Sequence, residues 1–185
     1  MVAMTSPALP LRQRILVVAA RRFREHGYAS TTVRQIATEL GVTVPALYHH
    51  FRNKEAILSE LVQLPVQVMH QLVDEVGALP SQERPRALLE GFLDRLAQHG
   101  GMIVPLMKDP SVLATGAVAP TLAVRRRILE ELAKSLSGPD AALRAAMALS
   151  AVEGAVDTFA ERSTGEDIAA DLPRAQVVAA ALRVI

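Results

Sequence analysis

Apolar residues in the first part of the chain recur at the spacing of amphipathic helices. A first helix is predicted between residues 12 and 23, where the apolar positions share one face and Gly27 would end the helix. A second is predicted from Thr32 to Gly41, because Thr32 and Gln35 have the spacing of a capping box and glycine can end a helix in the left-handed conformation. The apolar positions are Ile15, Val18, Ala19 and Phe23, then Val33, Ile36, Ala37 and Leu40.

A third, shorter helix is predicted over residues 44–51. Thr43 can cap it, and Pro45 is tolerated only in its first turn, where the missing N–H has no intrahelical partner. Leu47 and Phe51 lie four residues apart and should face the core. Together with the second helix and the glycine turn between them, this helix has the spacing of a helix-turn-helix. Nucleic-acid binding is therefore the first functional hypothesis.

Helices are also predicted over most of the remaining chain, with breaks at proline and glycine. The expected helices cover residues 54–76, 84–99, 120–136, 140–161 and 168–184. Asn53 should cap the first of these, and Pro65 should kink it. Gly100 and Gly101 should stop the second, and residues 102–118 should form only short helical turns. The chain as a whole thus predicts an all-α fold.

The net charge of +1 conceals an uneven distribution of charge along the chain. Residues 1–58 contain eight basic and three acidic residues, which give a net charge of +5. Residues 59–185 contain twelve basic and sixteen acidic residues, which give a net charge of −4. A basic N-terminal part on an acidic body is the electrostatic pattern of nucleic-acid binding. The alternative is that Arg21, Arg22 and Arg24 merely coat a solvated helix face.

Composition narrows the chemistry that the chain can perform. Half of the residues are apolar and the mean hydropathy is +0.23, which a dimer interface and an apolar ligand cavity would explain, as would an alanine-rich helical core. There is no cysteine, so disulfides and thiolate metal sites are excluded. The sequence has neither an apolar run of membrane-spanning length nor the pattern of a secretory signal. We therefore expect a cytoplasmic protein that does not bind membranes.

Several residues of the N-terminal part match a known pattern. They are Phe23, Gly27-Tyr28, Thr31-Thr32, Ile36-Ala37, Gly41-Val42, Leu47-Tyr48, His50-Phe51 and Lys54-Glu55. Through them, residues 11–58 resemble the DNA-binding domain of the TetR/AcrR family of bacterial transcriptional regulators. Tyr48, Phe51 and Lys54 after the glycine turn are the most specific part of the match.

The resemblance implies an all-helical homodimer. Residues 1–53 would form an N-terminal arm and a helix-turn-helix DNA-binding domain, and residues 54–185 a helical domain for ligand binding and dimerisation. Such a protein binds a pseudo-palindromic double-stranded DNA operator and is released by a small-molecule effector. It acts in the bacterial cytoplasm and is associated with the nucleoid when bound to DNA.

The resemblance also assigns DNA contacts to individual residues. Those expected to touch phosphates are Thr32, Thr43, Tyr48, His49 and Lys54. Those expected nearest the base edges are Arg34, Val44, Pro45 and Ala46. The last three offer little hydrogen-bonding chemistry, so we expect apolar contacts to thymine methyl groups from them and direct base reading from Arg34.

The last two predicted helices are candidates for dimerisation. Small residues are dense in the helix over residues 140–161, and small residues let helices approach closely. With the helix over residues 168–184, it would form a four-helix bundle across a two-fold axis. Packing within one protomer is the alternative.

An effector would need a pocket in the C-terminal domain, which we expect to be mostly apolar. The candidate lining residues are Phe92, Leu96, Met102, Met107, Met147 and Phe159, with His70, His99, Glu153 and Asp157 as candidate orienting groups. Methionine suits adaptable apolar sites, although the same side chains would also suit an ordinary core. Six aromatic residues and no tryptophan favour a flexible, largely aliphatic ligand over a large planar one.

An enzyme and a regulator controlled by a protein partner are the alternative functions. No zinc-protease, nucleophile-elbow or phosphate-loop motif surrounds the histidines. His49 and His50 are adjacent and point about 100° apart on a helix, which makes them a poor metal pair. We therefore expect no catalysis, no metal and no cofactor. A ligand-shaped cavity would distinguish an effector-controlled regulator from a partner-controlled one.

Overall fold

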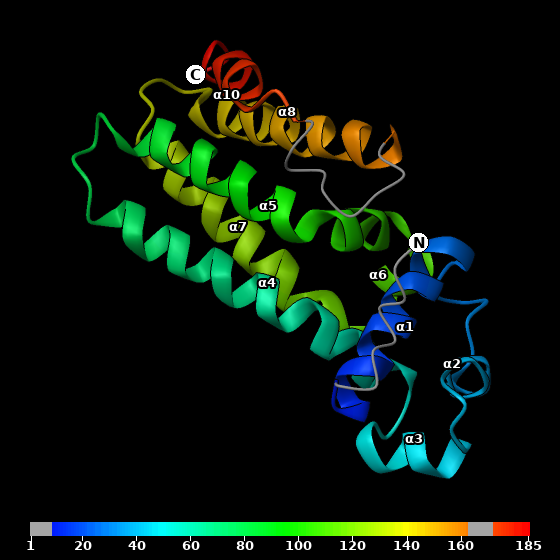
Figure 1. Ribbon diagram of the computed structural model, residues 1–185. Helices are drawn as coiled ribbons and strands as arrows, with labels where there is room; N and C mark the ends of the chain where they lie inside the picture. The colour runs from blue at the N-terminus through cyan, green and yellow to red at the C-terminus, as the bar shows by residue number, and fades with distance from the viewer. Residues whose placement is uncertain (1–8, 163–171) are drawn as a thin grey trace. The chain divides into compact units, whose positions relative to one another are not determined.

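The computed structural model describes residues 9–162 and 172–185, and all regular structure in these ranges is helical (Figure 1). The elements are α1 (Leu11–His26), α2 (Val33–Leu40), α3 (Val44–His50), α4 (Lys54–Gly77), α5 (Arg84–Lys108), α6 (Pro110–Leu113), the 3₁₀ helix η1 (Gly116–Val118), α7 (Ala119–Lys134), α8 (Ala141–Arg162) and α10 (Arg174–Leu182). The all-α prediction is confirmed. Of the helix predicted over residues 168–184, the first four residues lie outside the described ranges.

The chain forms two compact units, and neither unit is a single stretch of sequence. Unit 1 comprises residues 1–64 and 105–119, and unit 2 comprises residues 65–104 and 120–185. Helices α4 and α5 each pass from one unit into the other. Besides the expected helix-turn-helix region, unit 1 therefore contains the first turns of α4 and the segment around α6.

Capping groups set the ends of the first helices as the sequence predicts. Gly27 follows α1 with a φ of +82°, and Gly41 follows α2 with a φ of +69°, a region that favours glycine. Thr32 and Gln35 form the expected capping box at the start of α2. Asn53 caps α4 by accepting a 2.8 Å hydrogen bond from a backbone N–H of its first turn.

The core of unit 1 uses the apolar faces that the sequence predicts. Of the apolar positions expected to be buried in the first three helices, only Val33 is partly exposed. Four buried residues come from the distant segment that joins this unit: Leu106, Val112, Ala117 and Val118. The helix-turn-helix region thus shares its unit with residues far along the chain.

Helix α5 is longer than the sequence pattern predicts. The expected stop at Gly100 and Gly101 is wrong, because the helix continues to Lys108 and short helical turns begin only with α6. A glycine in a helix costs about 1 kcal/mol relative to alanine, and Pro105 removes one helical hydrogen bond. Leu106, which follows them, is only 2% exposed. Burial of this end of the helix offsets the local cost.

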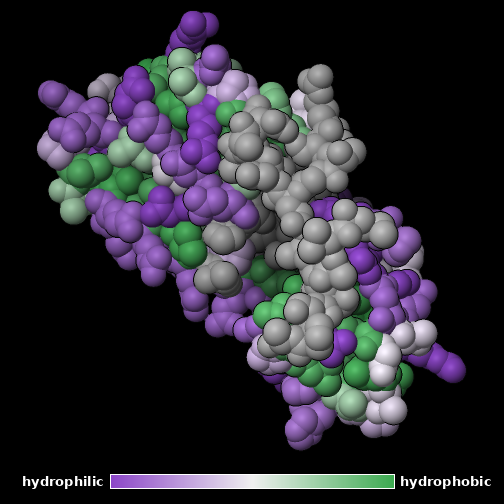
Figure 2. Space-filling view, viewed as in Figure 1, coloured by the Kyte–Doolittle hydropathy of each residue, from purple (hydrophilic) through white to green (hydrophobic). Residues whose placement is uncertain are grey.

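Unit 2 is built around one apolar core shared by α4, α5, α7, α8 and α10. Its most buried members include Leu88, Leu89, Ile128, Leu132 and Leu149. Helices α4 and α5 approach closely at Gly91, where a Cβ atom would overlap the side chain of Leu72. On the face shown in Figure 2, hydrophilic side chains cover much of the surface, with apolar patches between them.

Candidate nucleic-acid interface

Helix α3 is anchored by one face and leaves the other exposed. Leu47 within the helix and Phe51 directly after it are buried in unit 1. Tyr48 is 49% exposed, and Pro45 and His49 are also exposed. A helix that enters the major groove of DNA needs this arrangement, since its outward side chains must reach the bases.

The two threonines that were predicted to touch phosphates both cap helices. The Thr43 hydroxyl oxygen accepts the N–H of Ala46 at 3.3 Å. The Thr32 hydroxyl accepts the N–H of Gln35 at 3.2 Å and donates to its side-chain oxygen at 3.0 Å. The hydroxyl proton of Thr32 is therefore used inside the capping box, whereas that of Thr43 can be donated to an acceptor outside α3.

A groove of about 800 Å³ runs between the start of α2 and α3 in unit 1. It is lined by Ala29, Thr31, Thr32, Val33, Arg34, Val44, Pro45, Tyr48 and Lys54. Six of the nine predicted DNA-binding residues thus lie around one groove. The other three are Thr43, Ala46 and His49, which belong to α3 or its cap.

The Lys54 ammonium donates hydrogen bonds within the protein. Its acceptors are the carbonyl oxygens of Tyr28 at 2.6 Å and Thr31 at 2.9 Å. A longer bond of 3.4 Å reaches Ala29, and the ammonium lies 4.1 Å from the centroid of the Tyr28 ring. Burial lowers the pKa of Lys54, and the charge of Asp109 opposes this effect. The phosphate contact of Lys54 stays a prediction; here its donors hold the loop between α1 and α2.

Asp109 joins this loop from a distant part of the chain. Its carboxylate accepts the N–H of Tyr28 at 3.0 Å, while it also caps α6 through Ser111. The hydrogen bond from Ser111 is the largest cause that lowers the pKa of Asp109. The sequence Asp109-Pro110-Ser111 is a helix-start signal, so the cap could have been predicted, but the signal gives no sign of the bond to Tyr28.

The basic surface of unit 1 is smaller than its arginine count suggests. Arg21 and Arg22 both pair with Glu39. Arg12 pairs with Glu60. The exposed arginines of this region with no side-chain hydrogen bond or ion pair to another described residue are Arg24, Arg34 and Arg52. These three guanidinium charges are exposed and are not offset by an acidic partner among the described residues.

The described residues that were predicted to line an effector pocket differ in their surroundings. Phe92 and Leu96 are buried in the core of unit 2, and Phe159 packs against that core partly buried. Met147 is 51% exposed, although the adjacent Ala148 is fully buried. Met147 thus lies on the outer face of α8, and its role in lining a pocket stays a prediction.

The remaining pocket candidates have other surroundings. Met107 is partly buried and belongs to unit 1. The side chains of His99 and Met102 lie outside the described residues. Glu153 forms an ion pair with Arg125 at 2.8 Å and raises the pKa of that arginine. This pairing makes Glu153 less available to orient a ligand.

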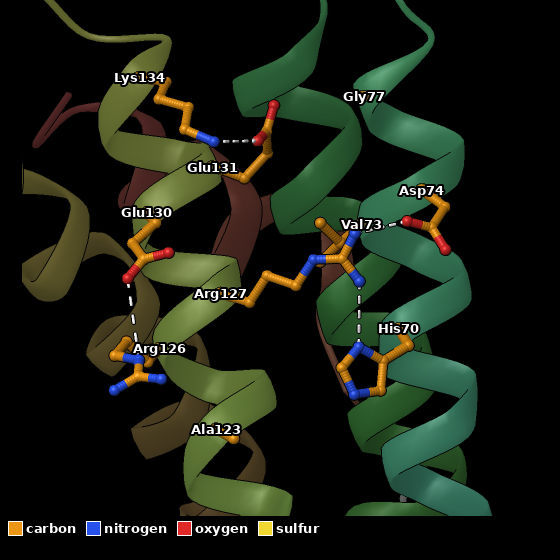
Figure 3. Close-up of a pocket in the computed structure, with 10 residues that line it drawn as sticks. All are labelled: His70, Val73, Asp74, Gly77, Ala123, Arg126, Arg127, Glu130, Glu131 and Lys134. Atoms are coloured by element: carbon orange, nitrogen blue, oxygen red, sulfur yellow. Dashed lines mark hydrogen bonds and ion pairs between the residues drawn. The ribbon is translucent and has the colours of Figure 1, made fainter.

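A groove of about 610 Å³ between α4 and α7 of unit 2 is charged (Figure 3). In this view Arg127 reaches across from α7, with its guanidinium 3.1 Å from His70 Nδ1 and 2.6 Å from Asp74 Oδ1. Two further ion pairs lie along α7: Arg126 with Glu130, and Lys134 with Glu131. These mutually paired walls do not match the mostly apolar pocket that was expected.

The described part of the chain offers no sign of a metal site or of a membrane span. No group of three or more metal-ligating side chains was found there. None of the helices in these residues is long and apolar enough to cross a bilayer. The adjacent rings of His49 and His50 lie edge to face, with their centroids 5.5 Å apart.

The fold and the exposed α3 define the class of helix-turn-helix regulatory proteins. Residues 15–61 match the family described as bacterial regulatory proteins, tetR family. The repressor AcnR of Corynebacterium diphtheriae is 39% identical over 100 residues, which are 54% of this chain and 52% of the relative. The regulator AcrR of Shigella flexneri is 31% identical over 113 residues, which are 50% of this chain and 53% of the relative.

Solved structures of similar fold cover nearly the whole chain. The TetR family regulator PfmR of Thermus thermophilus has a TM-score of 0.73 and 24% identity, covering 92% of this chain and 96% of its own. AmtR of Mycobacterium smegmatis has a TM-score of 0.68 and 26% identity, and the match covers 96% of this chain and 87% of AmtR. In sequence, the chain spans about half the length of the relatives AcnR and AcrR. Residues 15–61 thus carry the DNA-binding domain of the tetR family, and the chain as a whole shares the fold of a TetR family regulator.

Proposed function

We propose that this protein is a transcriptional repressor that binds a pseudo-palindromic DNA operator as a homodimer and is released by a small, mostly apolar ligand. The observation that carries the proposal is the exposed side of α3, whose anchored face and outward residues suit the major groove. The names of relatives such as AcnR, a transcriptional repressor, support repression as the direction of control.

The proposed DNA-contacting residues form two groups: one binds phosphates and positions the protein on the duplex, and the other reads the bases. Thr32, Thr43, Tyr48 and His49 are proposed to hold phosphates, which fixes the register but carries no sequence information. Lys54 stays with this group as a prediction, with its hydrogen bonds to the loop as the competing role. The base-reading group is Arg34, Val44, Pro45 and Ala46, of which Arg34 is exposed and without a side-chain partner among the described residues.

Dimerisation is proposed through the outer faces of α8 and α10. Leu143 is 62% exposed and Met147 51% exposed, and Ala151 continues the same face one turn further. Exposed apolar side chains in a row favour an interface over a free surface. Helix α10 packs against α8 and adds the exposed Ala175 and Ala179. This surface suits a two-fold four-helix bundle.

Effector control would follow from linkage. A small molecule that favours a protein state with poor DNA binding must release the operator by its difference in affinity for the two states. Phe92 and Leu96 in the core of unit 2, and Phe159, which packs against that core, remain the proposed apolar lining. A regulator controlled by a protein partner is the alternative, and it would need no ligand cavity.

The test starts without a known operator. The full chain would be used to select duplexes from a randomised pool, and the enriched sequences would be measured for affinity, symmetry and stoichiometry. We expect an inverted repeat with one α3 per half-site and half-sites about one helical turn apart or a multiple of it. Enrichment of no sequence above the starting pool would contradict the proposal.

A further inference from the structure

The loop between α1 and α2 is held from two sides by residues that are far away in the sequence. Lys54, at the start of α4, donates to the carbonyl oxygens of Tyr28 and Thr31. Asp109, between α5 and α6, accepts the N–H of Tyr28 at 3.0 Å. The same residue of the loop is therefore bound through its carbonyl by a cation and through its N–H by an anion.

Hydrogen bonds and ring packing among nearby residues also hold the loop between α1 and α2. Thr31 is only 1% exposed, and its hydroxyl donates to the carbonyl oxygens of Gly27 at 2.9 Å and Arg22 at 3.3 Å. The Tyr28 ring is 7% exposed and packs edge to face on Phe23, with centroids 5.1 Å apart. The loop thus has little freedom of its own while the bonds to its ends are intact.

Asp109 can hold the loop only because its two carboxylate oxygens face different partners. Oδ1 accepts the N–H of Ser111 at 2.8 Å and its hydroxyl at 2.6 Å, and these bonds cap α6. Oδ2 accepts from Tyr28. Gly27 lies beside Oδ2, and its φ of +82° is one that other residues rarely adopt, so the backbone conformation and not the space requires glycine there.

Resting on the proposed function, we infer that Asp109 is a positioning residue for DNA binding. It fixes Tyr28, and the loop ends at Thr32, the cap of α2. The groove beside α3 is lined by three loop residues as well as by α2 and α3. A loop that is free to move would spread the DNA-facing groups over several arrangements. Affinity then falls by the fraction of molecules in the competent arrangement.

The decisive variant is Asp109→Ser. Serine is a good helix cap, so α6 keeps its start, but its single oxygen cannot serve both α6 and Tyr28. Ser111→Ala is the matched control, because it removes one bond to the same carboxylate and leaves the bond to Tyr28 intact. Asp109→Asn, which keeps the shape but not the charge, provides a milder change should the serine variant fold poorly.

Three quantities would be measured on the full-length protein: affinity for the duplex that the wild type selects, affinity for a scrambled duplex, and hydrogen exchange of the Tyr28 amide. For Asp109→Ser we expect faster exchange at Tyr28 and about tenfold weaker binding of the selected duplex. The scrambled duplex should lose less affinity than the selected duplex, because base contacts depend most on the arrangement of the groove, and the salt slope should stay unchanged, because Asp109 touches no phosphate. A merely structural role would weaken both duplexes alike.

The outcomes separate this inference from the function on which it rests. Faster exchange at Tyr28 with selected-duplex affinity within twofold of the wild type would overturn the inference and leave the proposed function standing. The same weakening in Ser111→Ala would also overturn it, because the effect would then come from α6 alone. If the wild type selects no duplex, the proposed function fails and the inference fails with it, even if the exchange of Tyr28 responds as expected.

Discussion

Two cations near the start of α4 have different surroundings and should respond differently to removal. Lys54 donates to three loop carbonyls, so Lys54→Ala should lower the melting temperature, and its proposed phosphate contact would add a fall of about one in the salt slope of DNA binding. Arg52 is exposed without a side-chain partner among the described residues, so Arg52→Ala should lower the salt slope by about one and leave the melting temperature unchanged. Melting curves and affinities over a salt series measure both.

The comparison also decides the role of Lys54 in the complex. If the slope falls by about one for Lys54→Ala, its ammonium leaves the loop for a phosphate when DNA binds. If neither variant changes the slope, phosphate attraction rests on other residues such as Arg24 and Arg34.

The first turn of α3 should read methyl groups. Val44, Pro45 and Ala46 present only apolar side chains, so we expect them to contact thymine methyls. Replacing dT by dU under α3 removes the methyl and keeps the hydrogen-bonding edge. Affinity should fall about fourfold per buried methyl, from roughly 0.8 kcal/mol for each. The same replacement outside the protected site is the control, and equal affinities for the two duplexes would exclude methyl reading.

Arg34 should instead determine which base is preferred. Its exposed guanidinium has no side-chain partner among the described residues. We expect Arg34→Ala to broaden the sequence preference at one position of each half-site, as measured by repeating the selection. Loss of affinity without any change in preference would indicate a phosphate contact.

Acid should weaken the bond between Asp109 and the α1–α2 loop only at low pH. The pKa of Asp109 is lowered in the folded protein, chiefly by the hydrogen bond from Ser111. Its stabilising contribution is therefore complete above the unfolded value of about 3.9 and is lost as the pH falls through the lower folded value. Unfolding curves of the wild type and Asp109→Ser should differ most above pH about 4 and converge below it. A constant difference down to pH about 2 would exclude this linkage.

At single positions, the sequence predicts local interactions better than distant ones. The capping box of Thr32 and Gln35 could be predicted because both partners lie within one helical turn. The acceptors of Lys54 are more than twenty residues away in the chain, and Asp109 lies 81 residues from Tyr28. Which carbonyl or N–H such a side chain meets depends on the path of the backbone, which no local pattern contains.

At the scale of the element, α8 offers a matched test of dimerisation. Met147 on α8 and Leu122 on α7 are both 51% exposed. We expect Met147→Glu to shift the sedimenting species toward monomer, because the charge would enter the proposed interface, whereas Leu122→Glu should leave the dimer intact. Ala181 is unsuitable for this test, since it is fully buried within the protomer and a charge there would disturb the core. A wild type that sediments as a monomer at micromolar concentration would contradict the proposal.

Helix ends were predicted well where a special backbone conformation marks them and poorly where only composition does. Gly41 ends α2 in the left-handed conformation, as expected. Gly100 and Gly101 looked like a similar stop, but α5 continues through them and carries Leu106 into a buried position. The cost of glycine in a helix is small compared with the burial of a leucine, and the burial could not be known from the local pattern.

At the scale of the whole molecule, effector binding should couple stability to DNA release. A ligand present at about a hundred times its Kd stabilises the form that it binds by about 2.7 kcal/mol. In a thermal-shift screen we expect aliphatic acyl compounds to raise the melting temperature and release the selected duplex, and planar cationic dyes to do neither. Dyes that do both while the aliphatic compounds do nothing would contradict the expected ligand class.

The interleaved path of the chain also limits how this regulator can be engineered. Hybrid regulators are commonly conceived as a DNA-binding head from one protein joined to a sensing body from another at a single junction. Here a junction after residue 64 would leave behind residues 105–119, and with them Asp109 and the buried Leu106, Val112 and Val118 of unit 1. A working exchange would therefore have to transfer residues 1–64 and residues 105–119 together, because both stretches belong to the same compact unit.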